Sequence, residues 1–463
     1  MTAPGVNAVR PRPITLDLAT FASDTRADEL PEAVLHHAKG CLINMLGVAL
    51  HATQNPAIRI LVDLFEEGGG KPQASVLGFG AKTTLQNAAM ANGFLAHLDD
   101  FDDTYLPTVF HPSAPTVPPA LALAQYRHAS GRAFLTACAL GLEVSCRVAQ
   151  IVEAVRHGAV WHMTGIVGPF GAAAAAGRLL GLDAEAMARA FGLAGTQASG
   201  LRETFGTMTK AFHPGRAAQS GLLAAQLAQR GFTCTTSILE GPHGFVAAIA
   251  PGARDRSHGS ASLKTRWEFL DNALKPYACA ILAHAMVDAM RALRRRLGPV
   301  AEKVIRVSGR VNPLAITLES RPDPASGLES RLSFQHAMAV ALIDGAAYPS
   351  QFSDERASDP AVARLRRKID VTGDDSIAQD ACELTLTLDD GGVHTERVAH
   401  ATGTLENPMS DAQIEEKFRA LTHPVLGRSR ADQLLETLGR LEVVEDVSDI
   451  VELCRTNRNE ERA

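Results

Sequence analysis

The sequence predicts a mainly α protein with an α+β insert, that is, an all-helical bundle domain plus a smaller α+β domain. Apolar residues recur at a spacing near 3.6 from about residue 15 to residue 250, residues 303–312 and 382–400 alternate with a period of two, and helical spacing returns after Ser410. We therefore expect a first helical part over residues 1–268 and an α+β domain over 269–404. C-terminal helices over 405–463 are expected to return to the first bundle.

Six segments of the first part have the apolar spacing of buried helices. They span residues 35–50, 85–98, 133–152, 171–180, 184–194 and 217–229. Many of their contact positions are Ala or Gly, and small residues let helices approach one another closely. The Ala-rich run from Gly165 to Leu182 is also predicted to be a buried helix rather than a membrane span, because it is short and is interrupted by Gly168, Pro169 and Arg178.

The α+β domain is predicted from one helix and three strands. A helix is expected over residues 284–297 and a strand over 303–312. Residues 382–388 and 393–400 flank Asp-Asp-Gly-Gly, which is a turn-competent sequence between two alternating segments, so they predict a hairpin. In the tail, Ser410 and Gln413 have the spacing of a capping box at the start of a helix.

Composition and charge exclude several classes of protein. The 463 residues carry a formal net charge of −6, so a bulk basic surface for nucleic acid is absent. The seven Cys are scattered without a CxxC pair, which favours reduced thiols over a disulfide framework or a zinc site. The N-terminus has no apolar signal core. We expect a soluble, cytoplasmic protein with no nucleic-acid partner and no membrane association.

The most informative segment is a cluster of carboxylates flanked by two histidines. Like charges held this close repel one another, so the cluster needs a cation, a metal, shared protons or solvent. It consists of His97, Asp99, Asp100, Asp102, Asp103 and His111.

Three interpretations of this cluster are open. It can be a solvated helix end, since carboxylates favour a helix N-terminus. It can bind magnesium, because residues 99–103 fit the Asp-Asp-x-x-Asp pattern of all-helical prenyl-transfer enzymes. That class needs a second acidic motif, for which Asp446 and Asp449 are a poor match, and a pocket rich in aromatics, which make up only 5 % of this chain. The third interpretation is general acid–base chemistry beside cationic groups.

Two basic segments favour the third interpretation. His162 stands just before a Gly-rich helix start, and Lys210, His213 and Arg216 fall within seven positions ahead of another helix. Such a set near unsatisfied helix N–H groups is a receptor for carboxylates. Each residue alone has an ordinary explanation, His162 as a packing histidine and Lys210 as a surface lysine.

A wider set of segments follows the same order over nearly the whole chain, namely residues 92–104, 111–113, 195–197, 209–218, 275–279, 333–334 and 407–411. Together these segments resemble the MmgE/PrpD family. The resemblance implies a helical domain built from both chain ends with an inserted α+β lid domain, a homodimer, and no metal or organic cofactor. The family's activities include 2-methylcitrate dehydration, cis-aconitate decarboxylation and iminodisuccinate epimerisation.

The resemblance also implies the site residues. Asp100 matches the family's active-site aspartate, Thr104 and His111 match its partners in the same loop, and His162 and Lys210 match the next two site residues. We expect Asp100 or His162 to transfer the proton. Lys210 and His111 are expected to bind a substrate carboxylate and to stabilise enolate-like charge. Thr104 is expected to orient the groups of the site. His213 and Arg216 are further candidates for substrate binding. For Asp102 and Asp103, the alternative to a role in the chemistry is a structural one, in which they cap a helix or make hydrogen bonds that support the site.

Two positions depart from the decarboxylase branch of the family. That branch has a His shortly after its Lys-x-aromatic motif and a Tyr on a lid strand, whereas an ungapped match places Ala280 and Pro313 there. His284, one helical turn after Ala280, is either a substitute or a packing histidine.

The leading hypothesis is therefore a metal-independent enzyme that abstracts a proton next to a carboxylate of a small di- or tricarboxylate. A 2-methylcitrate dehydratase-like reaction comes first, epimerisation next and decarboxylation after it. The alternatives from other classes are the magnesium-dependent prenyl-transfer enzyme and a non-catalytic relative that only binds carboxylates.

Overall fold

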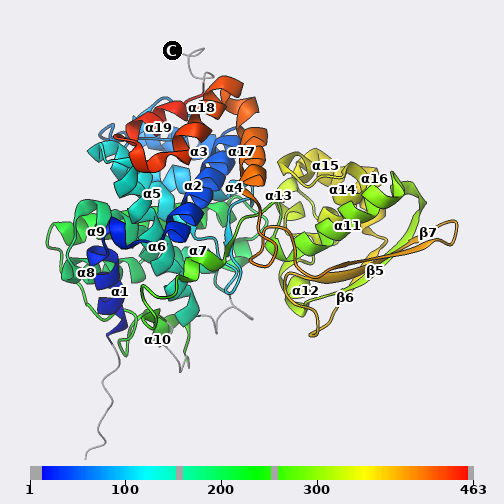
Figure 1. The fold of residues 1–463 in the computed structure, drawn as a ribbon, viewed down its shortest axis with the longest axis horizontal. Coiled ribbons are helices and arrows are strands. Elements are labelled where there is room, and N and C mark those ends of the chain that lie inside the picture. Colours follow the sequence, from blue (N-terminus) through cyan, green and yellow to red (C-terminus); the bar gives the residue numbers. More distant parts are fainter. Residues whose placement is uncertain (1–12, 153–159, 252–258, 457–463) are drawn as a thin grey trace, which may run out of the picture.

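A computed structural model describes residues 13–152, 160–251 and 259–456. It confirms the predicted fold class: most elements are helices, and the four-stranded sheet lies in a smaller domain (Figure 1). Apolar side chains form two cores. The larger one draws on residues 14–274 and 414–454, and the smaller one draws mainly on residues 273–401.

The helical domain contains the elements from the N-terminal part of the chain. Most of the helices predicted there are present within a few residues of the expected bounds. The helices are α1 (Ile14–Asp24), α2 (Glu32–Ala52), α3 (Ala57–Gly68), α4 (Leu85–Leu98), α5 (Ser113–Arg127), α6 (Gly131–Ile151), α7 (Met163–Leu180), α8 (Ala184–Gly195), α9 (Thr209–Gln229) and α10 (Phe245–Ile249). Two short antiparallel ladders accompany them, β1 (Ala74–Ser75) with β2 (Lys82–Thr83) and β3 (Thr104–Tyr105) with β4 (Asn272–Ala273).

Glycines let the central helices cross at very short distances. A Cβ added to Gly215 of α9 would lie 2.5 Å from the Met90 carbonyl oxygen of α4, and one added to Gly93 would lie 2.9 Å from the Gly215 Cα. Only glycine fits at such a crossing. The crossing brings the first turn of α9 to the C-terminal end of α4, where the aspartate cluster begins.

Helix α9 starts earlier than the apolar spacing predicts, at Thr209 instead of residue 217. Helix α7 begins at Met163, before the apolar spacing at residue 171 but close to Gly165, where the Ala-rich run predicted a buried helix. Their first turns contain Gly and Pro, which weaken the helical signal, but tight packing of these turns stabilises them. Lys210, His213 and Arg216 therefore lie inside the first two turns of α9 and not ahead of the helix.

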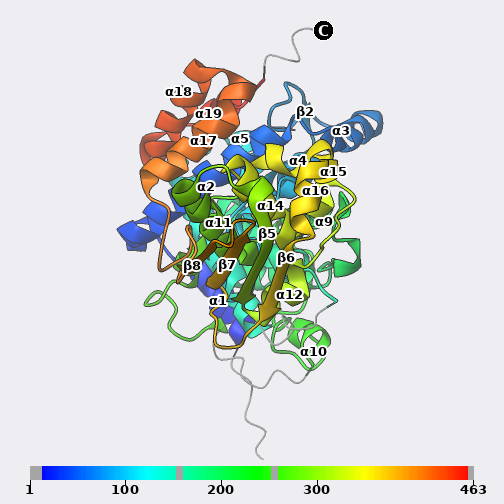
Figure 2. The same ribbon diagram turned by 90° about the vertical axis from the view of Figure 1, so that its right-hand side faces the viewer.

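The smaller domain is a mixed sheet with helices packed on it (Figure 2). Strand order is β6-β5-β7-β8, with β5 parallel to β6 and antiparallel to β7. Helix α11 packs on β7 and β8, and α12 packs on β6. The strands are β5 (Val304–Val311), β6 (Ile369–Gly373), β7 (Cys382–Leu388) and β8 (Val393–Val398), and the helices are α11 (His284–Leu297), α12 (Pro313–Glu319), α13 (Gly327–Ser330), α14 (Phe334–Asp344), α15 (Asp354–Ser358) and α16 (Pro360–Arg366).

The predicted strands of this domain are confirmed, with one local difference. Alternate residues of β7 from Cys382 to Leu388 are buried, and β7 pairs with β8 across the predicted turn. In β5 the register shifts between Val304 and Arg306, so that the buried residues are Val304, Val307 and Val311. A bulge inserts a residue and breaks the period of two that the sequence predicts there.

The C-terminal segment packs against the first helices of the chain. It forms α17 (Asp411–Leu426), α18 (Arg428–Gly439) and α19 (Ser448–Leu453), and α17 lies along α2 (Figure 1). The capping box between Ser410 and Gln413 is confirmed. The helical core thus contains both ends of the described chain, and the sheet domain is inserted between them.

Three helices, α2, α6 and α7, are long and apolar enough to cross a membrane by length and composition. In the structure, 61 %, 94 % and 83 % of their most apolar windows are buried inside the protein. Their apolar surface therefore packs against neighbouring helices.

Candidate active site

The aspartate cluster is a buried loop that follows α4, and not the solvated helix end considered from the sequence. Asp99 caps the C-terminus of α4, and Asp100 has a φ of 50°. The exposed fraction is at most 4 % for all four carboxylates. A helix C-terminus repels anions and burial penalises charge, so each carboxylate needs its own partners.

Two lysine ammonium groups hold Asp100 between them. Lys210 Nζ of α9 lies 2.8 Å from Oδ2, and Lys275 Nζ lies 2.7 Å from Oδ1 and 2.9 Å from the Asp100 carbonyl oxygen. Burial raises the pKa of the Asp100 carboxyl, but the charges of both lysines outweigh burial and hold it well below its usual value. Asp100 is therefore an ionised counter-ion with both oxygens engaged, and this makes it a poor base.

The pKa values of the two lysines shift in opposite directions around the same carboxylate. Burial lowers the pKa of Lys210, and Asp100 only partly restores it. Burial also lowers the pKa of Lys275, but Asp100 and Asp102 outweigh it and leave the pKa raised. Among the described residues, each ammonium donates through two of its three N–H bonds, so each keeps one for a ligand.

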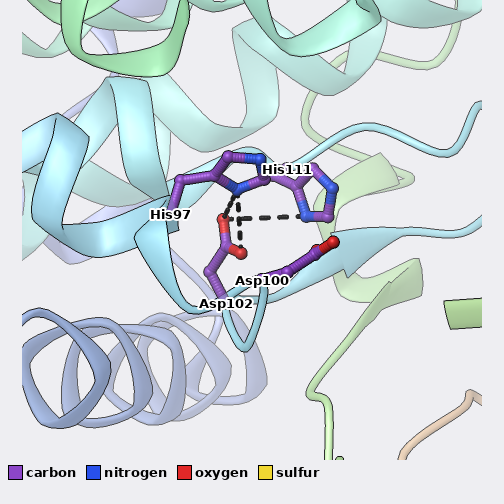
Figure 3. A group of neighbouring side chains, drawn as sticks. All are labelled: His97, Asp100, Asp102 and His111. Carbon is purple, nitrogen blue, oxygen red and sulfur yellow. Dashed lines mark hydrogen bonds and ion pairs between the residues drawn. The ribbon is translucent and has the colours of Figure 1, made fainter. Parts of the chain in front are cut away.

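Two histidines, His97 and His111, lie near Asp100 and Asp102 (Figure 3). His97 donates from Nδ1 to Asp102 at 2.9 Å and accepts from Lys210 at Nε2 over 3.0 Å. His111 donates from Nδ1 to the Asp103 carbonyl oxygen at 2.9 Å, and Thr104 Oγ1 lies 3.2 Å from the same nitrogen. Burial lowers the pKa of His97 well below its usual value and that of His111 to about 3. His111 Nε2 therefore carries a lone pair, oriented by the loop that contains Thr104.

Four side chains carry nitrogen or oxygen atoms that could bind a metal ion, and these atoms lie within 4.8 Å of one another. The four residues are His97, Asp100, Asp102 and His111. The outer carboxylates point elsewhere. Asp99 pairs with Arg331 at 2.9 Å and His51 at 2.6 Å, and Asp103 accepts from Ser113 at 2.5 Å and from Asn272. Asp99 and Asp103 thus do not converge with Asp100 on one ion, as an Asp-Asp-x-x-Asp magnesium motif requires, and the positive charge beside Asp100 comes from lysines. The predicted supporting hydrogen bonds of Asp102 and Asp103 are present.

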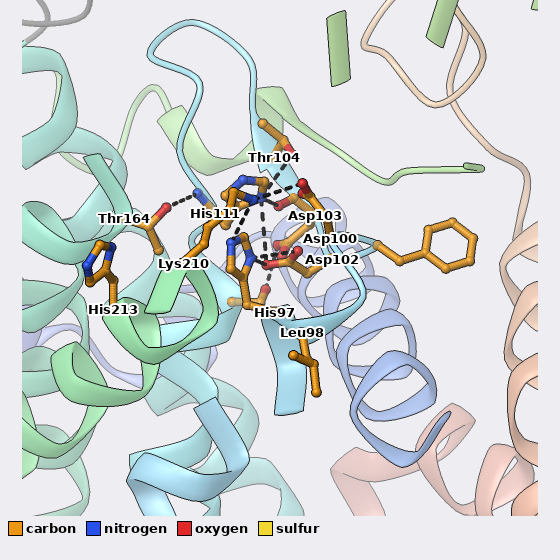
Figure 4. A network of polar contacts seen from close by, with 12 residues as sticks. His97, Leu98, Asp100, Asp102, Asp103, Thr104, His111, Thr164, Lys210 and His213 are labelled. Carbon is orange, nitrogen blue, oxygen red and sulfur yellow. Dashed lines mark hydrogen bonds and ion pairs between the residues drawn. The ribbon is translucent and has the colours of Figure 1, made fainter. Parts of the chain in front are cut away.

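His162 caps the N-terminus of α7 and contacts His213 of α9. Their Nδ1 atoms are 2.9 Å apart, so one of them carries the proton and the other accepts it. Burial lowers the pKa of His162 well below its usual value and that of His213 to about 4. Both are neutral near pH 7, and His213 holds the ring of His162 in place. Figure 4 places His213 at a distance from the aspartates.

These groups share one cavity at the junction of the two domains, with an empty volume of about 640 Å3 including its open mouth. Asp100, His111, His162, Lys210 and Lys275 contribute to its wall. Arg202 adds a further cation, and apolar side chains complete the lining. These are Val109, Trp161, Met163, Phe205, Ile281, Leu318 and Leu332.

Four of the predicted site residues lie outside the cavity wall, namely Thr104, His213, Arg216 and His284. Thr104 and His213 contact His111 and His162 from behind. The prediction that Arg216 binds substrate is wrong: it is exposed and contacts Gln219, because six positions after Lys210 on an α-helix a side chain points to a different side of the helix.

The prediction that His284 binds substrate is also wrong. It is fully buried at the start of α11, with Nε2 3.2 Å from the Cys279 carbonyl oxygen, and it does not line the cavity. Burial lowers its pKa to about 3. Its environment is that of a packing histidine, whereas Ala280 does contribute to the cavity wall.

Sequence reasoning gave no role to three residues that hold the site together. Lys275 belongs to a segment that carries the family resemblance, and this is the signal that points to it. Arg331 of the smaller domain donates to the Leu98 carbonyl oxygen at 2.6 Å, and this hydrogen bond connects the end of α4 to the smaller domain. Lys417 of α17 is buried and donates to Asn44, to the Phe101 carbonyl oxygen and to the Lys275 carbonyl oxygen at 2.7–2.8 Å. No local pattern identifies Arg331 or Lys417.

Replacing Lys417 with methionine should lower the free energy of unfolding by about 3 kcal/mol, since it leaves three buried acceptors without a donor. It should also reduce turnover, because two of those acceptors lie in the segments that carry Asp100 and Lys275. Urea titration measures the first effect. The exposed Lys71→Met is the matched control, and equal stability of the two variants would contradict a supporting role for Lys417.

The arrangement can bind an anion and move a proton. Two ammonium groups and Arg202 attract carboxylates, and fixed cations in a buried site stabilise negative charge that develops next to a carboxylate. His162 and His111 are neutral imidazoles, so each has a lone pair that can take up a proton. The geometry therefore suits proton transfer at a carbon acid.

Comparison with known proteins agrees with this chemistry. The MmgE/PrpD N-terminal domain matches residues 16–257, and the MmgE/PrpD C-terminal domain matches residues 277–442. The chain is 28 % identical to the cis-aconitate decarboxylase of Homo sapiens over 96 % of this chain and 94 % of that protein. It is also 28 % identical to the cis-aconitate decarboxylase of Aspergillus terreus over 95 % of both chains. The chain belongs to the MmgE/PrpD family of enzymes.

Proposed function

We propose that this enzyme is a metal-independent lyase that abstracts a proton next to a carboxylate of a small di- or tricarboxylate and eliminates water. The observation that carries the proposal is the meeting, in one buried cavity, of the two ammonium groups on Asp100 with the neutral His162. Cations bind the carboxylates and stabilise enolate-like charge, and the imidazole takes the proton.

Water elimination is the leading reaction because of the residue at position 280. The decarboxylase branch is expected to have a histidine there, whereas the cavity wall of this chain has the methyl group of Ala280. His284 is turned into the lid core and does not replace it. Pro313 begins α12 and is not among the residues that line the cavity.

Decarboxylation is the second candidate, and the named relatives favour it. The proteins from Homo sapiens and Aspergillus terreus are both cis-aconitate decarboxylases, and each aligns over nearly the whole chain. A cation-lined cavity of this kind also fits cis-aconitate. The two candidates differ in which bond breaks, not in how the carboxylates are bound.

Purified enzyme with 2-methylcitrate, citrate and cis-aconitate separates the candidates. We expect new alkene signals in proton NMR without release of CO2. Release of CO2 from cis-aconitate would assign decarboxylation. Solvent deuterium exchange into an imino- or aminodicarboxylate without an alkene product would assign epimerisation. Thermal stabilisation by tricarboxylates without any turnover would mean that the chain only binds them. Activity that survives a chelator would support a metal-independent reaction.

The chain is further proposed to act as a cytoplasmic homodimer, an assembly implied by its family resemblance. Light scattering should then give about twice the chain mass of 49.1 kDa. A mass equal to one chain would contradict the dimer.

A further inference from the structure

Glu319, the last residue of α12, contributes a carboxyl group to the wall of the cavity. Its exposed fraction is 3 %. Oε1 accepts from the backbone N–H of Leu282 at 3.0 Å. Oε2 has no hydrogen-bond partner among the described residues. A buried polar atom without a partner is rare in a folded protein, and a catalytic role, a bound ion or a bound water are the explanations for it.

A capping role alone does not account for this carboxyl. Leu282 lies in a short 3-10 helix, Ile281–Ala283, that leads into α11, so Oε1 does satisfy an N–H group at a helix start. Capping uses only one oxygen and leaves Oε2 buried without a partner. An ionised carboxylate would carry full charge on that oxygen, which is costly away from water.

A proton on Oε2 resolves this cost. Burial raises the pKa of Glu319 to about 8. The N–H groups of Leu282 and Ala283 and the charge of Lys275 oppose the rise, and Asp100 adds to it. The Cys279 thiol is a further titratable group close to Glu319. Near neutral pH, Glu319 is thus a carboxylic acid whose Oε1 accepts from the backbone and whose Oε2–H is a donor without an acceptor in the described protein.

We propose that Glu319 is the proton donor to the substrate in this cavity. The inference rests on the proposed function and adds the acid that a base such as His162 requires. In water elimination, the imidazole takes the proton from carbon and the electrons of that C–H bond form the C=C bond. The C–O bond breaks, its electron pair stays on oxygen, and Glu319 Oε2 gives its proton to that oxygen, which leaves as water. In decarboxylation, the same proton would go to the carbon that keeps the electron pair of the broken C–C bond.

The activity test uses Glu319→Gln, which keeps the size, the cap and a donor but cannot release a proton. We expect kcat to fall by about 100-fold or more with KM changed only slightly. The loss of wild-type activity as pH rises through about 8 should be absent from the variant. Glu302→Gln, on a lid side chain that is 83 % exposed, is the matched control. Retained turnover in Glu319→Gln would overturn the proposal and leave Glu319 as a cap.

A second measurement does not depend on activity. A carboxyl whose pKa rises on folding from 4.5 to about 8 contributes stability that is fully present below its unfolded pKa and is lost as pH rises through about 8. The melting temperature of the wild type should therefore fall relative to that of Glu319→Gln as pH rises from about 5 to about 9. Parallel curves would overturn the proton on Glu319. Failure of the proposed function shows separately, as absence of wild-type turnover on every polycarboxylate.

Discussion

Replacing Asp100 with asparagine should abolish turnover and lower the free energy of unfolding by about 3–5 kcal/mol. The change removes the only carboxylate that pairs directly with both Lys210 and Lys275 among the described residues, and leaves two buried ammonium groups facing each other. Their pKa values should fall and their positions change, so the fixed charge that stabilises the reaction is lost. A loss of about 10³-fold in kcat/KM is expected.

Asparagine isolates the effect of charge. It has nearly the size of aspartate and tolerates the left-handed backbone that position 100 adopts, with φ of 50°. Asp63→Asn on the exposed face of α3 is the control for a general effect of removing a carboxylate. Lys210→Ala should abolish activity as well. If Asp100→Asn and Lys210→Ala both turn over substrate at the wild-type rate, the site lies elsewhere.

Replacing His162 with glutamine should lower kcat by about 10²–10⁴-fold and leave KM nearly unchanged. His162 is proposed as the base, and glutamine fills the same space without a titratable nitrogen. The carboxylate-binding groups Lys210 and Lys275 remain in place, so binding persists. Rapid-quench and steady-state kinetics measure kcat and KM, with whichever polycarboxylate the enzyme turns over as the substrate.

The pH dependence provides a second test of His162. Burial and the neighbouring histidines and Lys210 hold the pKa of His162 well below 6.5, so its neutral form persists as pH falls below that value. Wild-type kcat/KM should therefore decline only well below pH 6.5, and His162→Gln should show no such decline. His36→Gln on the exposed face of α2 is the control. An unchanged kcat in His162→Gln would transfer the role of base to His111, the other neutral imidazole in the cavity wall.

Local patterns in the sequence were sufficient for the elements and for part of the site. The spacing of apolar residues predicted α4 and α8, the turn sequence predicted the β7–β8 hairpin, and Ser410 with Gln413 predicted the start of α17. Predictions failed where small residues or a bulge hide the period, at the start of α9 and in β5. The family resemblance identified Asp100, His111, His162 and Lys210, which all reach the cavity.

The sequence by itself determined which residue types are available, namely a run of carboxylates, several histidines and lysines near helix starts. Only the tertiary structure decided their roles, because protonation depends on neighbours that are distant in the chain. Lys275 lies 175 residues from Asp100, and Lys417 lies 316 residues from Phe101, yet they pair and hold the aspartate loop. Those contacts make Asp100 a counter-ion and not a base. Burial leaves His162 neutral and favours the proton on Glu319. Coulomb energy and desolvation depend on distance in space, and spacing along the chain does not reveal either.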